Sequence, residues 1–182
     1  GHDFRMWITP RYRHHYEYQS YEAFTADFMS SVLRSAKLFV DIGAHYGFYS
    51  VLAATKRPDL EIISVEPTPA TAAILARNTG LLDNSNITVL QRAASDFVGR
   101  SKFNVSFASD SCGFYEHPNA ATLHSVEVET LTIDSLLEGK DACPLVIKID
   151  TKGHELAVLR GMTRTLRSEE HTSELQSPYV IS

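Results

Sequence analysis

A glycine-bearing turn between an apolar segment and a helical one holds the first residues that could do chemistry. Asp41, Gly43 and Gly47 form a D-x-G-x-x-x-G pattern at the end of Leu38–Ile42. Gly43 can adopt backbone angles that residues with a Cβ avoid, which lets the backbone approach a ligand, and Gly47 allows a helix to pack closely on the strand. The pattern differs from the G-x-G-x-x-G dinucleotide fingerprint, and no G-K-[ST] follows as in a P-loop. We therefore expect a ligand site at this turn without a pyrophosphate cradle.

A second chemical group stands at the end of the next apolar segment. Glu66 closes Glu61–Val65 and lies about 20 residues beyond the glycine turn. An acid in this place can accept hydrogen bonds from the two hydroxyls of a ribose. A glycine turn or a terminal acid alone is an ordinary structural feature, but the two in this order favour nucleoside binding.

Bringing the two motifs together requires a parallel sheet. Short apolar runs predict buried strands, and apolar residues at helical spacing predict helices. The predicted strands are Leu38–Ile42, Glu61–Val65, Ile87–Leu90 and Leu145–Ile149, and the predicted helices are Tyr21–Ser35, Phe48–Thr55, Ala70–Asn78 and Glu155–Leu166. Strands that alternate with helices imply right-handed crossovers, so we expect an α/β fold with a doubly wound, mostly parallel open sheet. Its ligands would lie beyond the carboxyl ends of the strands.

Two segments depart from this alternation. Ser101–Ser106 and Ser125–Leu131 alternate polar and apolar residues, which predicts an antiparallel pair or an addition at the sheet edge. The loop Phe107–His124 between them has polar residues without a readable geometry. Trp7–Ser20 is rich in Tyr, His and Arg and has no clear period, so we expect a loop or a lid-like extension there.

Composition excludes several classes of protein. The 182 residues are 43% hydrophobic and 21% charged with a formal charge of −5, which fits one ordinary soluble domain. Scattered Lys and Arg give no footprint for nucleic acid or an anionic membrane, and no apolar run reaches the ~20 residues of a membrane span. Cys112 and Cys143 have no metal or disulfide pattern around them. We expect reduced thiols, no metal and a cytoplasmic location.

Five stretches of sequence, taken together, resemble one known family. They are F-V-D-I-G-A-H-Y-G-F-Y-S, V-E-P-T-P, A-A-S-D, V-E-V-E-T-L-T-I-D-S-L-L and I-K-I-D-T-K-G-H-E-L-A-V-L-R-G, between about Tyr21 and Met162. In this order they are similar to the FkbM family of methyltransferases. The resemblance implies a Rossmann-like class I methyltransferase fold and S-adenosyl-L-methionine as cofactor. It also implies O-methylation of a hydroxyl on a sugar, glycolipid or secondary metabolite.

The same resemblance assigns six residues to the cofactor. Glu66 would take the ribose hydroxyls, and Ser95 and Asp96 would lie near the adenine. A turn that ends a strand is an alternative explanation for Ser95 and Asp96. The residues that would line the methionine and ribose side are Asp41, Gly43 and Gly47.

Two positions depart from the family pattern. His45 stands where the family usually has Asn, and Lys152 precedes Gly153 where the family usually has an acid. Histidine can also donate and accept hydrogen bonds, so the first change is compatible with the site. The second reverses a charge near the expected substrate. For this reason we infer neither a metal nor an acidic clamp from Asp150, Lys152 and Glu155.

Methyl transfer from a sulfonium is an in-line displacement that depends mainly on alignment and on exclusion of water. A hydroxyl acceptor also benefits from a base that takes its proton. Asp150 is the first candidate for this base, and His45 and His154 are the others. Asp150 could instead cap the following helix, and either histidine could simply be half exposed. Asp134 is expected to be an N-cap.

We treat the two ends of the chain separately. Residues 1–20 are assigned to an N-terminal extension and residues 21–166 to the methyltransferase-like domain. Residues 168–182 resemble the translation of a sequencing adapter, so we interpret 167–182 as adapter-derived; a genuine solvated tail is the alternative. The class I fold has further strands, so the sheet is expected to stop after its fourth core strand and helix. Leu145–Ile149 would then be an unpaired edge that favours poor solubility.

Two other functions use parts of the same pattern. An NAD-dependent oxidoreductase also has a glycine turn and a strand-end acid, although the second glycine of G-x-G is absent here. A non-catalytic nucleoside-binding module of the same fold is compatible with Lys152. For the methyltransferase, the expected partner is a small-molecule or glycan hydroxyl.

Overall fold

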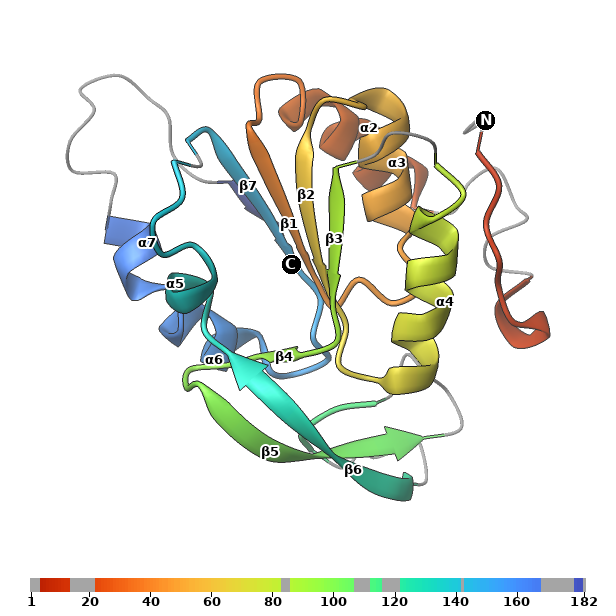
Figure 1. The fold of residues 1–182 in the computed structure, drawn as a ribbon, viewed down its shortest axis with the longest axis vertical. Helices are drawn as coiled ribbons and strands as arrows, with labels where there is room; N and C mark the ends of the chain where they lie inside the picture. Colours follow the sequence, from red (N-terminus) through yellow and green to blue (C-terminus); the bar gives the residue numbers. More distant parts are fainter. Residues whose placement is uncertain are drawn as a thin grey trace.

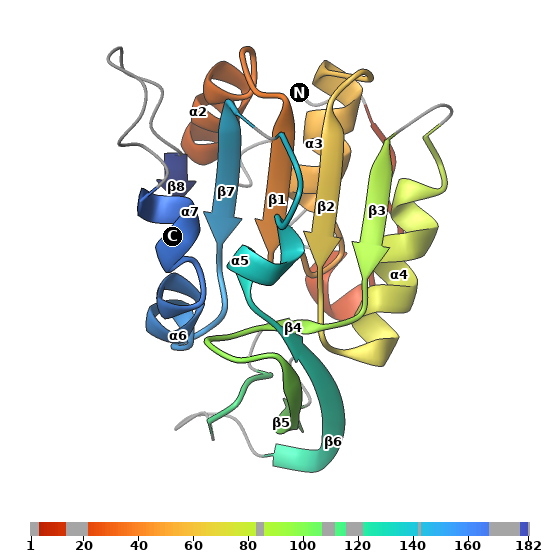
Figure 2. The same cartoon turned by 60° about the vertical axis from the view of Figure 1, so that its left-hand side comes forward.

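The centre of the molecule is a sheet of parallel strands in the order β3-β2-β1-β7-β8 (Figures 1 and 2). The computed structural model describes residues 4–13, 22–82, 86–106, 112–115, 122–141, 143–167 and 179–181. For residues 179–181 it describes the backbone only. The strands are β1 (Leu38–Ile42), β2 (Glu61–Val65), β3 (Ile87–Leu90), β7 (Leu145–Ile149) and β8 (Tyr179–Ile181). The first four coincide with the predicted strands, and every pairing in this sheet is parallel.

Helices cover both faces of this sheet, as Figures 1 and 2 show. On one side lie α2 (Ala23–Val32), α3 (Phe48–Lys56) and α4 (Pro69–Thr79). On the other side lie α5 (Ile133–Leu136), α6 (Glu155–Arg160) and α7 (Thr163–Arg167). The predicted α/β class with a doubly wound sheet is therefore confirmed.

The central strand β1 contributes to the apolar core on both faces, because successive residues of a strand point to opposite sides. Phe39 is buried in one hydrophobic cluster with Leu52 of α3, and Val40 is buried in another with Val158 of α6. Asp41 follows Val40 and so shares the face of Phe39. This alternation places a carboxylate beneath α3, at the carboxyl end of the sheet.

A second, smaller sheet lies beyond the carboxyl ends of the parallel strands (Figures 1 and 2). It consists of β4 (Ala93–Ala94), β5 (Gly99–Ser106) and β6 (Thr122–Leu131) in the order β4-β6-β5. The pairing of β5 with β6 is antiparallel, which confirms the predicted antiparallel pair. The small sheet therefore stands opposite the edge where ligands of parallel sheets bind.

The predicted helix Glu155–Leu166 is in fact two short helices, α6 and α7, separated at Gly161 and Met162. At Gly161 the chain runs against another backbone, since a Cβ there would lie 2.0 Å from the carbonyl oxygen of Ser95. The carbonyl of Gly161 also accepts a hydrogen bond from the amide of Asp134, at 3.0 Å. The prediction of one continuous helix is therefore wrong, because helical spacing has no information on these contacts.

Asp134 was expected to cap the helix that it opens, and this prediction is also wrong. The N-cap of α5 is Thr132, which forms a reciprocal capping box with Ser135. The carboxylate of Asp134 instead accepts the amides of Arg164 and Thr165 at 2.9 and 2.8 Å, in the first turn of α7. A side chain from one short helix thus satisfies the amide groups at the start of another.

The outer edge of β7 is paired, contrary to the expectation of an unpaired strand. Val146, Ile147 and Lys148 of β7 are in register with Tyr179–Ile181 of β8. A bare strand edge offers a row of backbone donors and acceptors, which explains how a short segment can pair there. The sheet therefore does not stop at its fourth strand. Residues 168–178 of the segment interpreted as adapter-derived lie outside the described residues.

The described helices are short. Within the part of the chain that the structure describes, no helix has both the length and the apolar character needed to cross a membrane.

Candidate functional site

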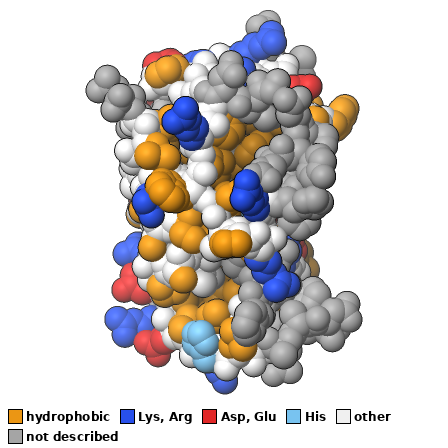
Figure 3. All heavy atoms as spheres, turned by 90° about the vertical axis from the view of Figure 1, so that its right-hand side faces the viewer, with side chains coloured by type: hydrophobic (Ala, Val, Ile, Leu, Met, Phe, Trp, Pro, Cys, Tyr) orange, Lys and Arg blue, Asp and Glu red, His pale blue; other side chains and the backbone are white. Residues whose placement is uncertain are grey.

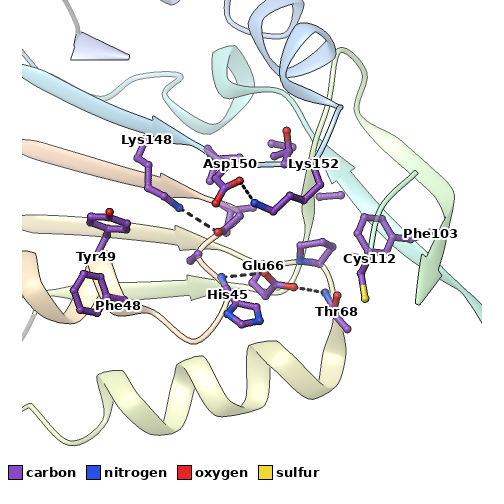
Figure 4. Close-up of a pocket in the computed structure, with 18 of the residues that line it drawn as sticks. His45, Phe48, Tyr49, Glu66, Thr68, Phe103, Cys112, Lys148, Asp150 and Lys152 are labelled. Carbon is purple, nitrogen blue, oxygen red and sulfur yellow. Dashed lines mark hydrogen bonds and ion pairs between the residues drawn. The ribbon is translucent and has the colours of Figure 1, made fainter. Parts of the chain in front are cut away.

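A cavity of about 210 Å³ opens at the carboxyl ends of β1, β2 and β7 (Figure 4). Its walls include residues 42–45 at the end of β1, 65–68 around the end of β2 and 150–152 after β7. The small sheet and its loop add Phe103 and Phe114. The cavity thus lies where the sequence places the ligand of such a sheet.

Both glycines of the turn adopt positive φ angles, 69° at Gly43 and 87° at Gly47. A Cβ on Gly47 would lie 2.5 Å from Leu75 of α4, so this glycine permits close helix packing, although onto α4 rather than onto the strand. A Cβ on Gly43 would lie 2.0 Å from the carbonyl oxygen of Asp150. The close approach at Gly43 is therefore to the protein's own backbone after β7, which holds the turn against Asp150.

The backbone amides of the turn are already engaged within the protein. Gly43 and Ala44 both donate to the carbonyl of Val65, at 2.9 and 3.1 Å. The amide of His45 donates to the carboxylate of Glu66 at 3.1 Å. A phosphate cradle needs such amides to point at the ligand. The arrangement of these three agrees with the prediction that the turn is not a pyrophosphate site.

Glu66 is buried at the end of β2, and its carboxylate faces the cavity (Figure 4). Oε2 accepts the amide of His45 at 3.1 Å, and Oε1 accepts the amide of Thr68 at 3.0 Å. Burial raises the pKa of Glu66, and the hydrogen bonds from Thr68 and His45 and the charge of Lys148 only partly offset it. Each carboxylate oxygen can accept a further hydrogen bond, so Glu66 can take a pair of ligand hydroxyls.

His45 occupies a backbone conformation that explains the residue found there. Its φ is 51°, in the left-handed region, where Asn, Asp and His are several-fold enriched among non-glycine residues. Its ring stacks on Tyr46 with centroids 3.9 Å apart and meets the edge of Tyr12 at 5.3 Å. The change from the usual Asn therefore keeps the turn and adds an aromatic surface at the cavity.

A buried ion pair lies beneath the turn and was missed by the sequence analysis. Nζ of Lys148 lies 2.9 Å from Oδ1 of Asp41 and donates to the carbonyl of Gly43 at 3.2 Å. Oδ2 of Asp41 accepts the hydroxyl of Ser50 at 2.7 Å. Asp41 is fully buried and does not line the cavity, whereas Lys148 does. The available signal was a lysine inside the apolar strand Leu145–Ile149, because a buried charge requires a partner.

A second ion pair stands on the cavity wall after β7. Nζ of Lys152 lies 2.7 Å from Oδ1 of Asp150, and both side chains are half exposed. Burial alone would raise the pKa of Asp150, but the hydrogen bond from Lys152 and the nearby charges of Lys148, Lys152 and His45 hold it below its ordinary value. Asp150 lines the cavity, as predicted, and its lowered pKa means that the carboxylate binds a proton weakly.

Asp150 does not cap the helix that follows it, so that alternative is wrong. The amides of Thr151 and Gly153 donate to the carboxylate of Glu155 at 3.0 and 3.1 Å. These bonds lower the pKa of Glu155 against the opposing effect of its burial. Glu155 thus accepts the amides that precede α6, and Asp150 lies in the cavity lining.

His154, Ser95 and Asp96 lie together but away from the cavity lining. Nε2 of His154 is 3.0 Å from the hydroxyl of Ser95, which donates to Asp96 at 3.2 Å. The His154 ring stacks on Phe114 at 4.0 Å, and burial lowers its pKa. This cluster joins the loop after β7 to the small sheet, so its members support the cavity wall rather than line it.

The small sheet and its loop supply an apolar wall. Phe103, Cys112 and Phe114 line the cavity, and the rings of Phe103 and Phe114 meet edge to face at 5.2 Å. Burial raises the pKa of the Cys112 thiol, which therefore stays protonated and packs as an apolar group. Such a wall suits a flat ring system. Residues 107–111 and 116–121 of the loop between the strands lie outside the described residues.

The N-terminal segment also reaches the cavity, which the sequence analysis did not predict in detail. The 3-10 helix η1 (Pro10–Tyr12) places Tyr12 on the cavity wall. The buried side chain of Asn78 donates to the carbonyls of Trp7 and Tyr46 at 2.9 and 2.7 Å. On the face shown in Figure 3, hydrophobic side chains spread among several Lys and Arg. Residues 14–20 of the predicted extension lie outside the described residues.

Among the residues that the structure describes, no group of three or more His, Cys, Asp or Glu side chains could hold a metal ion.

The methyltransferase FkbM domain matches residues 41–174, which is more than half of the chain. The chain belongs to this family. Its cofactor is therefore S-adenosyl-L-methionine. The match includes residues 167–174, the first part of the segment interpreted as adapter-derived, and that interpretation stays a prediction.

A curated relative supports the same family. The hexuronic acid methyltransferase AglP of Haloferax volcanii is 31% identical over 136 residues. The aligned region covers 70% of this chain and 51% of AglP. The chain thus spans about half the length of this relative.

Two solved methyltransferase structures match parts of the chain. The precorrin-6y C5,15-methyltransferase from Geobacter metallireducens GS-15 is 16% identical with a TM-score of 0.45, and the alignment covers 78% of this chain and 55% of that one. The SAM-dependent methyltransferase from Agrobacterium tumefaciens is 14% identical with a TM-score of 0.36, covering 40% and 24%. The fold assignment itself follows from the parallel strand order of the central sheet.

Proposed function

We propose that this chain binds S-adenosyl-L-methionine in the cavity and that the protein transfers its methyl group to an oxygen atom of a sugar. The observation that carries the proposal is the buried carboxylate of Glu66, which faces the cavity beside the glycine turn after β1. A carboxylate at this place is suited to the two ribose hydroxyls of a nucleoside.

The residues present fit this cofactor. Glu66 would hold the ribose, while the wall of Phe103, Cys112 and Phe114 would cover the adenine. The turn at Gly43 and Gly47 would shape the methionine side, with Asp41 acting from beneath. Ser95 and Asp96 would support the wall through His154. When bound, the cofactor supplies a methyl group on a sulfonium, which is already activated for displacement.

The acceptor would enter beside Asp150 and Lys152. A hydroxyl acceptor gains from a base, and Asp150 lies on the cavity wall in a suitable place. His45 is the second candidate, because its ring packs against Tyr12 and Tyr46 at the same cavity. His154 is a weaker candidate, since its ring is enclosed by Ser95 and Phe114 away from the lining.

One observation favours a carboxylate as a second kind of acceptor. The pKa of Asp150 is held below its ordinary value, chiefly because Lys152 and the other nearby charges outweigh its burial. A weak base assists a hydroxyl poorly, whereas a carboxylate needs no deprotonation by the enzyme near neutral pH. The relative AglP is named for a hexuronic acid, a sugar that has both kinds of oxygen.

The decisive experiment measures methyl transfer to a panel of hexoses and hexuronic acids, free and in glycans, followed by mild alkali. A methyl ether on a hydroxyl survives alkali, and a methyl ester on a carboxyl is cleaved. With a hydroxyl acceptor, Asp150→Asn is expected to lower kcat by about 10²- to 10⁴-fold. With a carboxylate acceptor, the same variant should retain most of its kcat.

Binding experiments separate the alternatives. Calorimetric titration with S-adenosylhomocysteine and with NAD tests the oxidoreductase, which the engaged amides of Gly43, Ala44 and His45 disfavour. Binding of S-adenosylhomocysteine without transfer to any acceptor would support a non-catalytic module. Binding of NAD alone would overturn the proposed function.

A further inference from the structure

The cavity has charges of both signs, and their positions bear on how the cofactor's amino-acid end is held. Glu22, Glu66 and Asp150 supply carboxylates, while Lys148 and Lys152 supply ammonium groups. The cofactor of the proposed function has a cationic sulfonium and an α-amino group, which the acids can accommodate. Its α-carboxylate, however, needs a positive or hydrogen-bond-donating partner in a cavity with several acids.

Three amides of the glycine turn already have partners within the protein. The amides of Gly43 and Ala44 donate to Val65, and the amide of His45 donates to Glu66. Releasing any of them for a ligand would break the contacts that join the turn to β2. A side-chain cation beside the turn can supply the partner without breaking these contacts.

Lys148 has the position and the support for this role. It belongs to β7, lines the cavity and is only 11% exposed at its side chain. Its ammonium has three N–H donors. Among the described residues its acceptors are Oδ1 of Asp41 at 2.9 Å and the carbonyl oxygen of Gly43 at 3.2 Å. The ring of Tyr49, 5.3 Å from Nζ, borders the same part of the cavity.

Lys152 is less suited to the same task. Its ammonium lies 2.7 Å from Asp150, and both side chains are half exposed. Solvent screens an exposed pair, and Asp150, the partner of Lys152 in it, lies only two residues away in the same loop. Lys152 pairs with Asp150, the first candidate for the base, so we place it toward the acceptor.

We infer that Lys148 binds the α-carboxylate of the cofactor, and that Asp41 is the positioning residue that holds the Lys148 ammonium beside the glycine turn. The inference rests on the proposed function, because it assigns one subsite of the same cofactor. Asp41 and Lys148 face each other in the register of β1 with β7, so the sheet itself sets their separation.

A pair of ligands isolates the amino-acid end. S-adenosylhomocysteine has the α-carboxylate, and 5′-methylthioadenosine keeps the adenosine and sulfur but lacks the amino acid. Calorimetry on the full chain is expected to show that Lys148→Met weakens S-adenosylhomocysteine about 10- to 100-fold, the loss of a charge-assisted hydrogen bond. Binding of 5′-methylthioadenosine should change less than about twofold, within the error expected of a distant substitution.

Two further variants separate loss of binding from loss of folding. Lys148→Met alone leaves the buried carboxylate of Asp41 without its cation. The double variant Asp41→Asn with Lys148→Met removes both charges and is therefore expected to fold. It should show the same selective loss. Lys140→Met is the matched control, because Lys140 pairs with Glu61 at 2.7 Å outside the cavity lining.

Each outcome decides the inference. Equal weakening of both ligands by the double variant would make the pair a structural support only and overturn the inference. A selective loss in Lys152→Met, with none in the double variant, would move the carboxylate site to Lys152 and also overturn it. If the wild-type chain binds neither ligand, the proposed function itself fails.

Discussion

Two Asp–Lys pairs of almost equal length have their lysines on β7 and on the loop after it, yet they belong to different environments. Asp41 and Lys148 are 2.9 Å apart with side chains 0% and 11% exposed, and Asp150 and Lys152 are 2.7 Å apart with side chains 44% and 47% exposed. The first pair is surrounded by protein, and the second borders solvent. Distance alone would rank them as equals, so burial must decide what each contributes.

The pairs also differ in how the chain makes them. Asp150 and Lys152 are two residues apart in sequence, so a local turn is sufficient to bring them together. Asp41 and Lys148 are 107 residues apart and meet because β1 and β7 are neighbours in register. A local pair can form before the sheet is complete. The long-range pair exists only when the two strands have joined.

The largest expected effect comes from breaking the buried pair. Lys148→Met should lower the free energy of unfolding by about 3–5 kcal/mol, because Asp41 would be left as an uncompensated buried charge. Urea denaturation followed by circular dichroism measures this change. The double variant Asp41→Asn with Lys148→Met should recover most of the loss. A single variant as stable as wild type would show that solvent reaches Asp41.

A smaller effect is expected at Glu66, a third acid of the site, which accepts backbone amides rather than a lysine. Glu66→Gln should weaken S-adenosylhomocysteine by about 1–3 kcal/mol, because an amide replaces a carboxylate opposite the ribose hydroxyls. Isothermal titration calorimetry measures the change. An unchanged affinity would remove Glu66 from the ribose site.

The acid at this position also predicts a pH dependence. Burial raises the pKa of Glu66, so the group takes up its charge only above the ordinary range of a glutamate. The anion is the better acceptor for hydroxyls, and affinity for S-adenosylhomocysteine should therefore rise as pH increases through that raised pKa. For stability the sign is opposite, since charging a buried carboxylate disfavours the fold. Titrations of wild type and Glu66→Gln across acidic pH test this, and a slope that persists in the variant would assign it to another group.

The smallest effect is expected at the exposed pair. Lys152→Met should change the free energy of unfolding by less than about 1 kcal/mol, because solvent screens the interaction with Asp150. The same urea experiment measures it beside Lys148→Met. A loss comparable to that of the buried pair would mean that the two environments are alike and would remove the contrast between them.

The sequence predicted those parts of the site that follow from local order along the chain. The turn at Gly43, the acid at Glu66 and the four core strands were found because glycine, a strand-end acid and apolar runs have characteristic spacings. Lys148 was missed as a functional residue, since its partner Asp41 is distant in sequence and only the sheet register joins them. The sequence pattern also could not predict that Ser95 and His154 lie away from the cavity lining.

The same reason explains the errors in secondary structure. The helix break at Gly161 depends on the carbonyl of Ser95, and the cap of α7 comes from Asp134 in another helix. Periodicity describes a segment by itself and has no information on such neighbours. The pairing of β8 with β7 belongs to the same class of contact.

The buried amide of Asn78 has a consequence for how the protein could be studied in solution. It binds the backbone of Trp7 and that of Tyr46, so the N-terminal segment and the glycine turn beside the cavity share one anchor. Trp7 is the sole tryptophan of the sequence, and the guanidinium of Arg77 lies 3.5 Å from its ring centroid. Coupling between two sites is reciprocal. A ligand that rigidifies the glycine turn should therefore alter the emission of this one indole, which gives the protein an intrinsic fluorescent reporter.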